Sequence, residues 1–176
     1  NGSGKSSLVR AGLVPKLRLG ALRGSERWLV ADMYPGARPF AELESALLQV
    51  AVDRPDDLEA RLSEGNWENL LAELLPRDSE LLLVVDQFEE LFTVTTDGDE
   101  RRRFLGALAG LVSDPRNRVR VVVTMRADFY DRPLQYEVLG RLLKENTEIV
   151  LPLTAEELSW AVREPARRMG VRLESG

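Results

Sequence analysis

The sequence contains no cysteine and no histidine. The lack of cysteine excludes disulfide bonds and thiolate metal sites, and the lack of histidine removes the commonest zinc ligand and acid–base side chain. Any chemistry in this chain must therefore use carboxylates, lysine, arginine, hydroxyl groups and a bound metal ion. The chain also has no apolar run close to the ~20 residues that cross a bilayer, and no signal-peptide pattern. We therefore expect a cytoplasmic protein with no membrane partner.

The rest of the composition is ordinary for one globular domain. The chain has 176 residues, of which 44% are hydrophobic and 30% are charged, and this length is enough for a single buried core. The net charge is −5, which argues against a surface that coats nucleic acid. Two arginine clusters, one at 101–103 and one at positions 116, 118 and 120, are more typical of solvated faces than of a DNA-binding site.

A phosphate-binding pattern stands at the start of the chain. The run NGSGKSS matches the second half of the P-loop pattern G-x-x-x-x-G-K-[ST]. Glycines let backbone N–H groups approach phosphate oxygens, and the helix that begins here turns its positive end toward the anion. Lys5 would reach the β- and γ-phosphates, and the Ser6 hydroxyl would bind Mg²⁺. The predicted nucleotide-binding residues are Gly2, Ser3, Gly4, Lys5, Ser6 and Ser7.

The opening glycine of that pattern would lie just ahead of Asn1, so we expect the strand that precedes a P-loop to be missing from this sequence. Apolar residues continue at helical spacing directly after the motif and support the P-loop interpretation; they are Leu8, Val9, Leu13 and Leu17. The alternative is a frayed terminus rich in glycine and serine.

Strand and helix patterns alternate along the rest of the chain, which predicts an α/β domain with a mostly parallel sheet. Strands are predicted at 27–33, 81–85, 119–124 and 148–153, and helices at 5–18, 39–50, 104–112, 134–143 and, as two short helices, within 54–75. A capping-box pattern from Thr154 to Glu157 opens another helix. Residues 1–153 are therefore predicted to form the core domain, and 154–176 the start of a helical extension.

Polar residues follow two of these strands, at the place where ligands bind in open parallel sheets. Asp86 ends the first as the carboxylate of a Walker B motif and is, with Ser6, a predicted Mg²⁺ ligand. Glu89 and Glu90 follow as candidates for orienting or deprotonating the attacking water. Arg126, with Thr124 beside it, ends the second strand, where a guanidinium can contact a γ-phosphate. We predict Glu89, Glu90 and Arg126 as catalytic residues on two adjacent strands.

Each of these residues also has a purely structural interpretation. Asp86 would then be a turn cap, and the two glutamates would be the solvated start of a helix. Arg126 would pair with Asp128 or Asp131.

Gln87 departs from the commonest pattern of P-loop ATPases, in which a catalytic glutamate directly follows the Walker B aspartate. The departure leaves Glu89 or Glu90 to activate water, with a slight preference for Glu90, or leaves hydrolysis slow.

Four runs span nearly the whole chain: NGSGKSSLVRAGLVPKLR, LLLVVDQFEELF, VRVVVTMRADFYDR and LPLTAEELSWAVREPA. With them the chain resembles the STAND class of signalling P-loop NTPases, and most closely the novel STAND domains of bacterial multidomain proteins. DQFEEL is similar to the D-G-x-D-E-L Walker B motif of NACHT ATPases, and TMR is similar to the T-x-R sensor strand of NB-ARC ATPases. The resemblance implies a three-layer P-loop NTPase fold of the additional-strand type, with ATP and Mg²⁺ bound by the residues named above.

The resemblance also implies a function, that of a slowly hydrolysing ATP·Mg²⁺ switch that resets an oligomerising signal transducer. The implied partners are the nucleotide, a helical and winged-helix region of the same chain, WD-repeat or similar sensor domains, and further copies of the protein. A motor or loader ATPase of the AAA+ type is one alternative, and it would need an arginine finger from a neighbouring subunit. A nucleotide-binding interaction module is another, with Gln87 marking lost catalysis.

Overall fold

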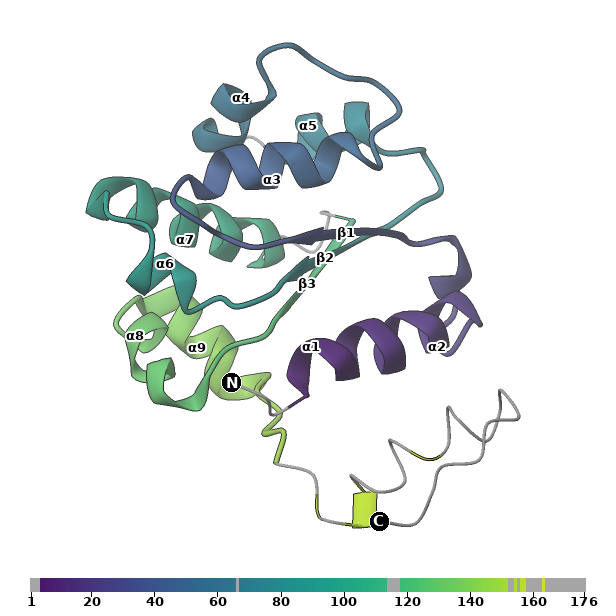
Figure 1. The fold of residues 1–176 in the computed structure, drawn as a ribbon. Coiled ribbons are helices and arrows are strands. Elements are labelled where there is room, and N and C mark those ends of the chain that lie inside the picture. The colour runs from purple at the N-terminus through teal and green to yellow at the C-terminus, as the bar shows by residue number, and fades with distance from the viewer. Residues whose placement is uncertain are drawn as a thin grey trace.

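The computed structural model describes residues 4–65, 67–113 and 118–151, with Thr154, Glu156, Glu157 and Arg163 beyond them. Within these residues the strands form one parallel sheet in the order β1 (Leu29–Met33), β2 (Leu81–Val85) and β3 (Val119–Val123). Helices cover both faces of the sheet (Figure 1). The predicted α/β class with a parallel sheet is confirmed, and the strands that lead to Asp86 and Arg126 are neighbours as expected.

The helices alternate with the strands along the chain, as the apolar periodicity predicts. In the described residues they are α1 (Lys5–Ser7), the π-helix η1 (Leu8–Leu13), α2 (Val14–Arg18), the 3₁₀-helix η2 (Ser25–Arg27), α3 (Pro39–Leu48), α4 (Leu58–Glu64), α5 (Trp67–Leu74), α6 (Glu90–Thr93), α7 (Gly98–Ser113), the 3₁₀-helix η3 (Ala127–Phe129), α8 (Asp131–Leu134) and α9 (Glu137–Glu145).

The sheet separates two hydrophobic clusters. Every side chain of β2 is buried, as an uninterrupted apolar run predicts for a strand covered on both faces. The odd-numbered residues of β2 face the larger cluster with α3 and α7, where the rings of Phe40 and Phe104 meet edge to face at 5.3 Å between centroids. The even-numbered residues of β2 face the smaller cluster with the first helix. The side chain at position 86 therefore falls on the face of that first helix.

The segments α1, η1 and α2 form one helical run over 5–18, the extent that the leucine spacing predicts. Its middle is a π-helix, after which the Val14 N–H bonds to the Val9 carbonyl. Pro15 follows and has no N–H to donate, so a regular α-helical ladder cannot continue through this turn. Val9, Val14 and Leu17 are buried against β2. This packing fixes the N-terminal helix (5–18) under the sheet.

Several predicted boundaries differ from the structure: the helix at 39–50 ends at Leu48, the strand at 119–124 ends at Val123, and the helix at 104–112 begins at Gly98. Two further differences have a local cause. β1 begins at Leu29 rather than at residue 27, because the preceding residues form η2. The helix predicted over 134–143 is two helices, α8 and α9. The chain breaks between them at Tyr136, which has extended backbone angles of φ −101° and ψ 108°.

The strand predicted at 148–153 is wrong over 148–151, which form no regular element. Ile149 and Leu151 are 76% and 73% exposed. A strand needs a neighbour that supplies its hydrogen bonds, and within the described part of the chain these residues pair with no strand. Residues 152 and 153 lie outside the described residues.

The described residues beyond 151 include one clear motif. The Thr154 N–H donates to Glu157 Oε2 at 2.8 Å, and the Glu157 N–H donates to Thr154 Oγ1 at 3.2 Å. This reciprocal pair is the predicted capping box, which is confirmed. Most of the predicted helical extension over 154–176 lies outside the described residues, so its division from the core at residue 153 stays a prediction.

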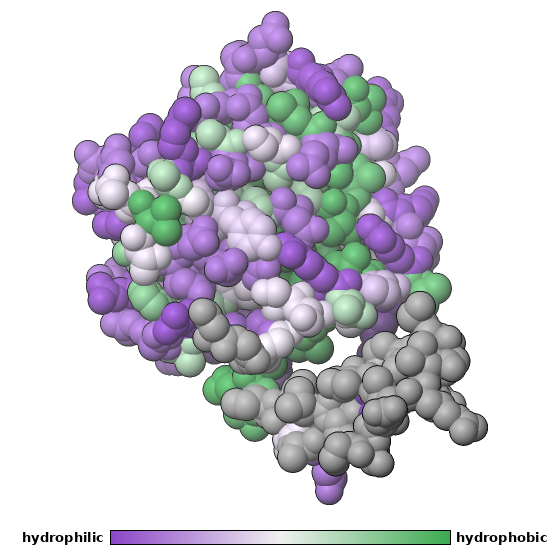
Figure 2. Space-filling model, in the orientation of Figure 1, coloured by the Kyte–Doolittle hydropathy of each residue, from purple (hydrophilic) through white to green (hydrophobic). Residues whose placement is uncertain are grey.

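The face of the molecule seen in Figure 2 is mainly hydrophilic. In Figure 2 hydrophobic residues are mostly scattered among charged ones, with some gathered near the level of the sheet, as is usual for a folded domain. Among the described residues, no helix combines the length and the apolar character that spanning a membrane would require.

Candidate functional site

The carboxyl ends of the strands lie beside the first turn of the N-terminal helix (Figure 1). The last residues of β1, β2 and β3 are level in the parallel register. The residues that follow them, Tyr34, Asp86 and Thr124, therefore share one edge of the sheet. Ser6 reaches this edge from α1. The sequence predicted that the P-loop and the ends of β2 and β3 would meet, and the structure brings them together.

Asp86 is at the centre of this edge and is only 2% exposed. Its Oδ1 accepts hydrogen bonds from Ser6 Oγ at 2.7 Å, from the Gln87 N–H at 3.0 Å and from the Thr124 hydroxyl. Burial alone would raise the pKa of this carboxyl. The hydrogen bonds from Thr124 and Ser6, the nearby charge of Arg10 and the Gln87 amide together outweigh burial and lower its pKa. Asp86 is thus held as an oriented carboxylate.

Gln87 has a backbone φ of 52°, and it is the non-glycine residue with positive φ in the described part of the chain. Its N–H points back to Asp86 Oδ1 and to Thr124 Oγ1, the latter at 3.2 Å. Such conformations cost energy and cluster at functional sites. The strained backbone at Gln87 therefore serves to orient the Asp86 carboxylate. The Gln87 side chain itself is exposed.

Arg10 also reaches Asp86, and sequence reasoning missed it. Its Nη2 lies 3.4 Å from Asp86 Oδ2, and its Nε lies 3.5 Å from Oδ1 of Asp32 on β1. Its guanidinium carbon lies 5.4 Å from the centroid of the Tyr34 ring. One sequence signal was available, because Arg10 is four residues after Ser6 and so falls on the same side of the helix.

The described part of the predicted P-loop starts at Gly4, which has a φ of 71°. Apart from its chain neighbours and its own helix, no heavy atom of the described residues lies within 4 Å of where its Cβ would be, so the backbone conformation rather than crowding favours glycine here. The Gly4 carbonyl accepts the Leu8 N–H at 2.7 Å and starts the helix. Lys5 and Ser7 belong to α1, beside Ser6. The predicted residues Gly2 and Ser3 lie outside the described residues.

Glu89 and Glu90 lie in the turn after β2 but face different neighbours. Glu89 Oε2 accepts the Arg126 N–H at 3.3 Å, at the end of β3. Glu90 Oε2 accepts the Gly36 N–H at 3.1 Å, in the loop after β1. Thr95, which is 3% exposed, donates its hydroxyl to the Gly36 carbonyl at 2.8 Å. Glu90 and Thr95 thus form a clamp on both sides of Gly36, which we call the Gly36 clamp.

Arg126 pairs with Asp128, one of the two partners that the sequence allowed. Its Nε donates to Asp128 Oδ1 at 3.0 Å and its Nη2 to Oδ2 at 2.6 Å. The hydrogen bond and charge of Asp128, with a smaller contribution from Glu89, raise the pKa of the guanidinium. The Arg126 side chain is 44% exposed, and exposed pairs of this kind are worth little and exchange readily. The Arg126 guanidinium can therefore exchange Asp128 for an anionic ligand.

A comparison with protein families bears on these interpretations. The family model for Novel STAND NTPase 1 matches residues 1–176. The chain belongs to the Novel STAND NTPase 1 family. The resemblance to STAND NTPases, which was inferred from the sequence motifs, is therefore confirmed. Membership of this family indicates a signalling domain that binds and hydrolyses nucleotides. No curated protein and no solved structure gave a match.

In this STAND NTPase domain the atoms around Asp86 suit a magnesium ion. Mg²⁺ prefers hard oxygen ligands, and proteins bind it through one or two side chains plus substrate phosphates and water. Ser6 Oγ and Asp86 Oδ1 are two such oxygens, 2.7 Å apart. No group of three or more His, Cys, Asp or Glu side chains that could hold a metal ion occurs among the described residues. Mg²⁺ at Asp86 would therefore need phosphate and water ligands as well.

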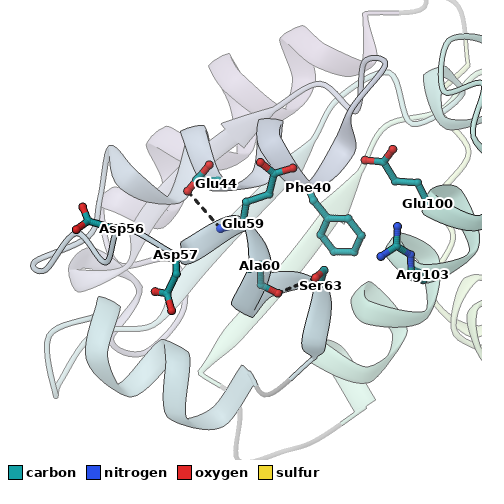
Figure 3. Close-up of a pocket in the computed structure, with 9 residues that line it drawn as sticks. All are labelled: Phe40, Glu44, Asp56, Asp57, Glu59, Ala60, Ser63, Glu100 and Arg103. Carbon is teal, nitrogen blue, oxygen red and sulfur yellow. Dashed lines mark hydrogen bonds between the residues drawn. The ribbon is translucent and has the colours of Figure 1, made fainter.

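A cavity of about 480 Å³ opens elsewhere in the STAND NTPase domain, between α3, α4 and α7 (Figure 3). None of the predicted site residues lines it. Its lining includes five carboxylates and one guanidinium, and a negative lining of this kind repels phosphate. The cavity is therefore unsuited to a nucleotide. The residues that line it are Phe40, Glu44, Asp56, Asp57, Glu59, Ala60, Ser63, Glu100 and Arg103.

Proposed function

We propose that this domain binds ATP·Mg²⁺ and hydrolyses it slowly, as the nucleotide switch of a STAND-type signalling protein. The observation that carries the proposal is the 2.7 Å hydrogen bond from Ser6 Oγ to Asp86 Oδ1. It joins the serine of the P-loop to the carboxylate of the Walker B motif, although the two are 80 residues apart in the sequence. In P-loop NTPases these two groups hold one Mg²⁺ that bridges the β- and γ-phosphates.

The phosphate-binding part of the proposal uses the P-loop residues together. Backbone N–H groups of Gly2, Ser3, Gly4 and Ser7 would cradle phosphate oxygens, with the Lys5 ammonium on the β- and γ-phosphates. The fold that this implies is the three-layer P-loop NTPase fold of the additional-strand type. Helices on both faces of the β1-β2-β3 sheet support it, and so does family membership.

For catalysis we propose Glu89 as the residue that orients or deprotonates water. Sequence reasoning slightly preferred Glu90. Each carboxylate accepts one backbone N–H, but Glu90 Oε2 is held at 3.1 Å by Gly36, in the loop after β1, whereas the contact of Glu89 Oε2 with the Arg126 N–H is longer, at 3.3 Å. Glu89 instead lies against the end of β3, where it contributes to the raised pKa of Arg126. Glu89 and Arg126 are thus together at the strand end that would face a γ-phosphate. In this scheme Arg126 leaves Asp128 to contact that phosphate.

The wider setting follows from the family and is also part of the proposal. The partners would be helical, winged-helix or sensor domains of the same protein and further copies that assemble in a nucleotide-dependent manner in the cytoplasm. An interaction module that binds nucleotide without turnover is the second candidate. The non-acidic Gln87 after Asp86 and the engagement of Glu90 by Gly36 favour it. Steady-state turnover beside a binding measurement separates the two, because a module binds without turnover.

The Lys5→Ala variant tests the nucleotide proposal. It removes the positive charge from the β/γ-phosphate position and should weaken ATP binding by at least about tenfold, or about 1.4 kcal/mol. Calorimetric titration of the full-length protein with ATP·Mg²⁺ measures this change. Lys16→Ala is the matched control, since Lys16 is an exposed lysine of the same helical run and its removal should change nothing. Equal affinity in wild type and Lys5→Ala would overturn the proposal.

A further inference from the structure

Arg10 contacts the proposed metal ligand from the same helix that carries the P-loop serine. Ser6 and Arg10 are one turn apart, and both reach the carboxylate of Asp86. Arg10 lies within the π-helix η1, and π-turns occur frequently at functional sites because they redirect side chains. The helix thus contacts the Asp86 carboxylate with the neutral hydroxyl of Ser6 and with the positively charged guanidinium of Arg10.

The two oxygens of Asp86 are used differently. Oδ1 accepts three hydrogen bonds, from Ser6, Gln87 and Thr124. Oδ2 faces the Arg10 Nη2 at 3.4 Å, which is a charge contact longer than a good hydrogen bond. The neutral donors therefore fix the orientation of the carboxylate, and Arg10 supplies the positive charge next to its other oxygen.

Arg10 also has a second set of partners to which it can withdraw. Oδ1 of Asp32 lies 3.5 Å from its Nε, and the face of the Tyr34 ring lies within cation–π range. Both come from the end of β1, on the side away from β3. The guanidinium therefore bridges the two carboxylates, and the Arg10 and Asp32 side chains are each 42% exposed, so the contact with Asp86 can be lost while those with Asp32 and Tyr34 remain.

We propose that Arg10 is a positioning residue that holds Asp86 Oδ2 in the absence of a divalent cation and competes with that cation for Asp86. This inference rests on the proposed ATP·Mg²⁺ function. A guanidinium and Mg²⁺ on the same carboxylate repel one another. Binding of the cation therefore requires Arg10 to withdraw to Asp32 and Tyr34. Arg10 raises the concentration of Mg²⁺ at which nucleotide binds, and Asp32 lowers it by accepting the displaced charge.

The test is the dependence of ADP binding on free Mg²⁺, measured by calorimetry in the full-length protein. ADP is chosen because it is not consumed during the titration. Arg10→Met removes the charge and keeps an apolar stem, and it should lower the half-saturating Mg²⁺ concentration by about tenfold, the size of one charge contact near the surface. Arg10→Lys should restore most of the wild-type value. Arg18→Met removes an exposed arginine further along the helix and should leave the midpoint unchanged.

Asp32→Asn gives a second test with the opposite sign. It removes the alternative acceptor, so Arg10 stays on Asp86 and the half-saturating Mg²⁺ concentration should rise by about threefold. This variant keeps the test open even where Arg10→Met fails to fold. A midpoint that is unchanged or raised in Arg10→Met, or lowered in Asp32→Asn, would overturn the inference while wild-type binding stands. A wild-type protein that binds no ADP at any Mg²⁺ concentration would instead overturn the proposed function.

Discussion

The exchange of each glutamate after β2 for glutamine separates the water-activating residue from the structural one. Glutamine keeps the size and an acceptor oxygen but cannot take a proton. For Glu90→Gln the Gly36 N–H keeps a neutral acceptor in place of a charged one. Hydrogen bonds to charged groups contribute about 1.5–3 kcal/mol, against about 0.5–1.5 kcal/mol for neutral ones. The expected loss is therefore about 1 kcal/mol of folding stability, with turnover within about threefold of wild type.

Glu89→Gln should behave in the opposite way. Its carboxylate accepts one long hydrogen bond, from the Arg126 N–H at 3.3 Å, so the exchange should hardly change stability. Loss of a general base typically slows the chemical step by about 10²–10⁴-fold. The assay is single-turnover ATP hydrolysis beside ATP affinity and a urea unfolding midpoint. Affinity should stay within about twofold of wild type, which isolates the loss to the chemical step.

Thr95→Val is the matched control for the Gly36 clamp. It removes the hydroxyl that bonds the Gly36 carbonyl and should cost about 1 kcal/mol of stability, because the half-buried Gly36 then loses this hydrogen bond. If Glu90 acts only through the clamp, Thr95→Val and Glu90→Gln should both lower stability and neither should abolish turnover. A Glu90→Gln enzyme that folds normally but hydrolyses far more slowly than Glu89→Gln would refute the assignment.

Two further predictions concern Arg126 and Asp86. Arg126→Ala should weaken ATP binding more than ADP binding, because only the γ-phosphate is within its proposed reach; equal losses in a competition titration would leave Arg126 as the ion-pair partner of Asp128 alone. The lowered pKa of Asp86 in the folded protein means that its ionisation stabilises the fold above the ordinary pKa of about 3.9 and that this contribution is lost as the pH falls through the lower folded value. Urea unfolding between pH 7 and pH 3 should therefore show a steeper loss of stability in wild type than in Asp86→Asn, and parallel curves would contradict the assigned pKa direction.

The fold could be predicted where a pattern is set by burial. The run at 81–85 has apolar side chains on both faces, and only a central strand gives every one of them a buried place. The pairing of Thr154 with Glu157 is a local motif and depends on nothing distant. The run at 148–151 also carries three apolar residues, but Ile149 and Leu151 are exposed, because a strand depends on a neighbour that its own sequence does not encode.

For the candidate site, the sequence predicted which acidic residues and which residues of the P-loop motif would take part. Two motifs predicted that Ser6 and Asp86 bind one Mg²⁺, and the hydrogen bond between them shows that the two side chains are close enough for this. The contact of Arg10 with Asp86 was not predicted, because a spacing of four residues from Ser6 is a weak signal on an amphipathic helix whose other arginine is solvated. The different neighbours of Glu89 and Glu90 also depend on the loops after β1 and β3, whose approach to the turn is set by the register of the sheet.

The proposed competition at Asp86 has a consequence for how nucleotide occupancy could be transmitted. The Arg10 guanidinium packs over the Tyr34 ring. Tyr34 is two residues before Gly36, which is hydrogen-bonded to the segment after β2 through the Gly36 clamp. If the Arg10 guanidinium moves from Asp86 toward Asp32, it displaces Tyr34, which begins the loop that leads into α3. The loop is held at Met33 by β1 pairing and at Gly36, in its middle, by the clamp, so a displacement of Tyr34 would act first on the clamp. We therefore expect the response to the cation at the clamp and, through it, at the start of α3, which packs on the face of the sheet opposite to the 5–18 helix.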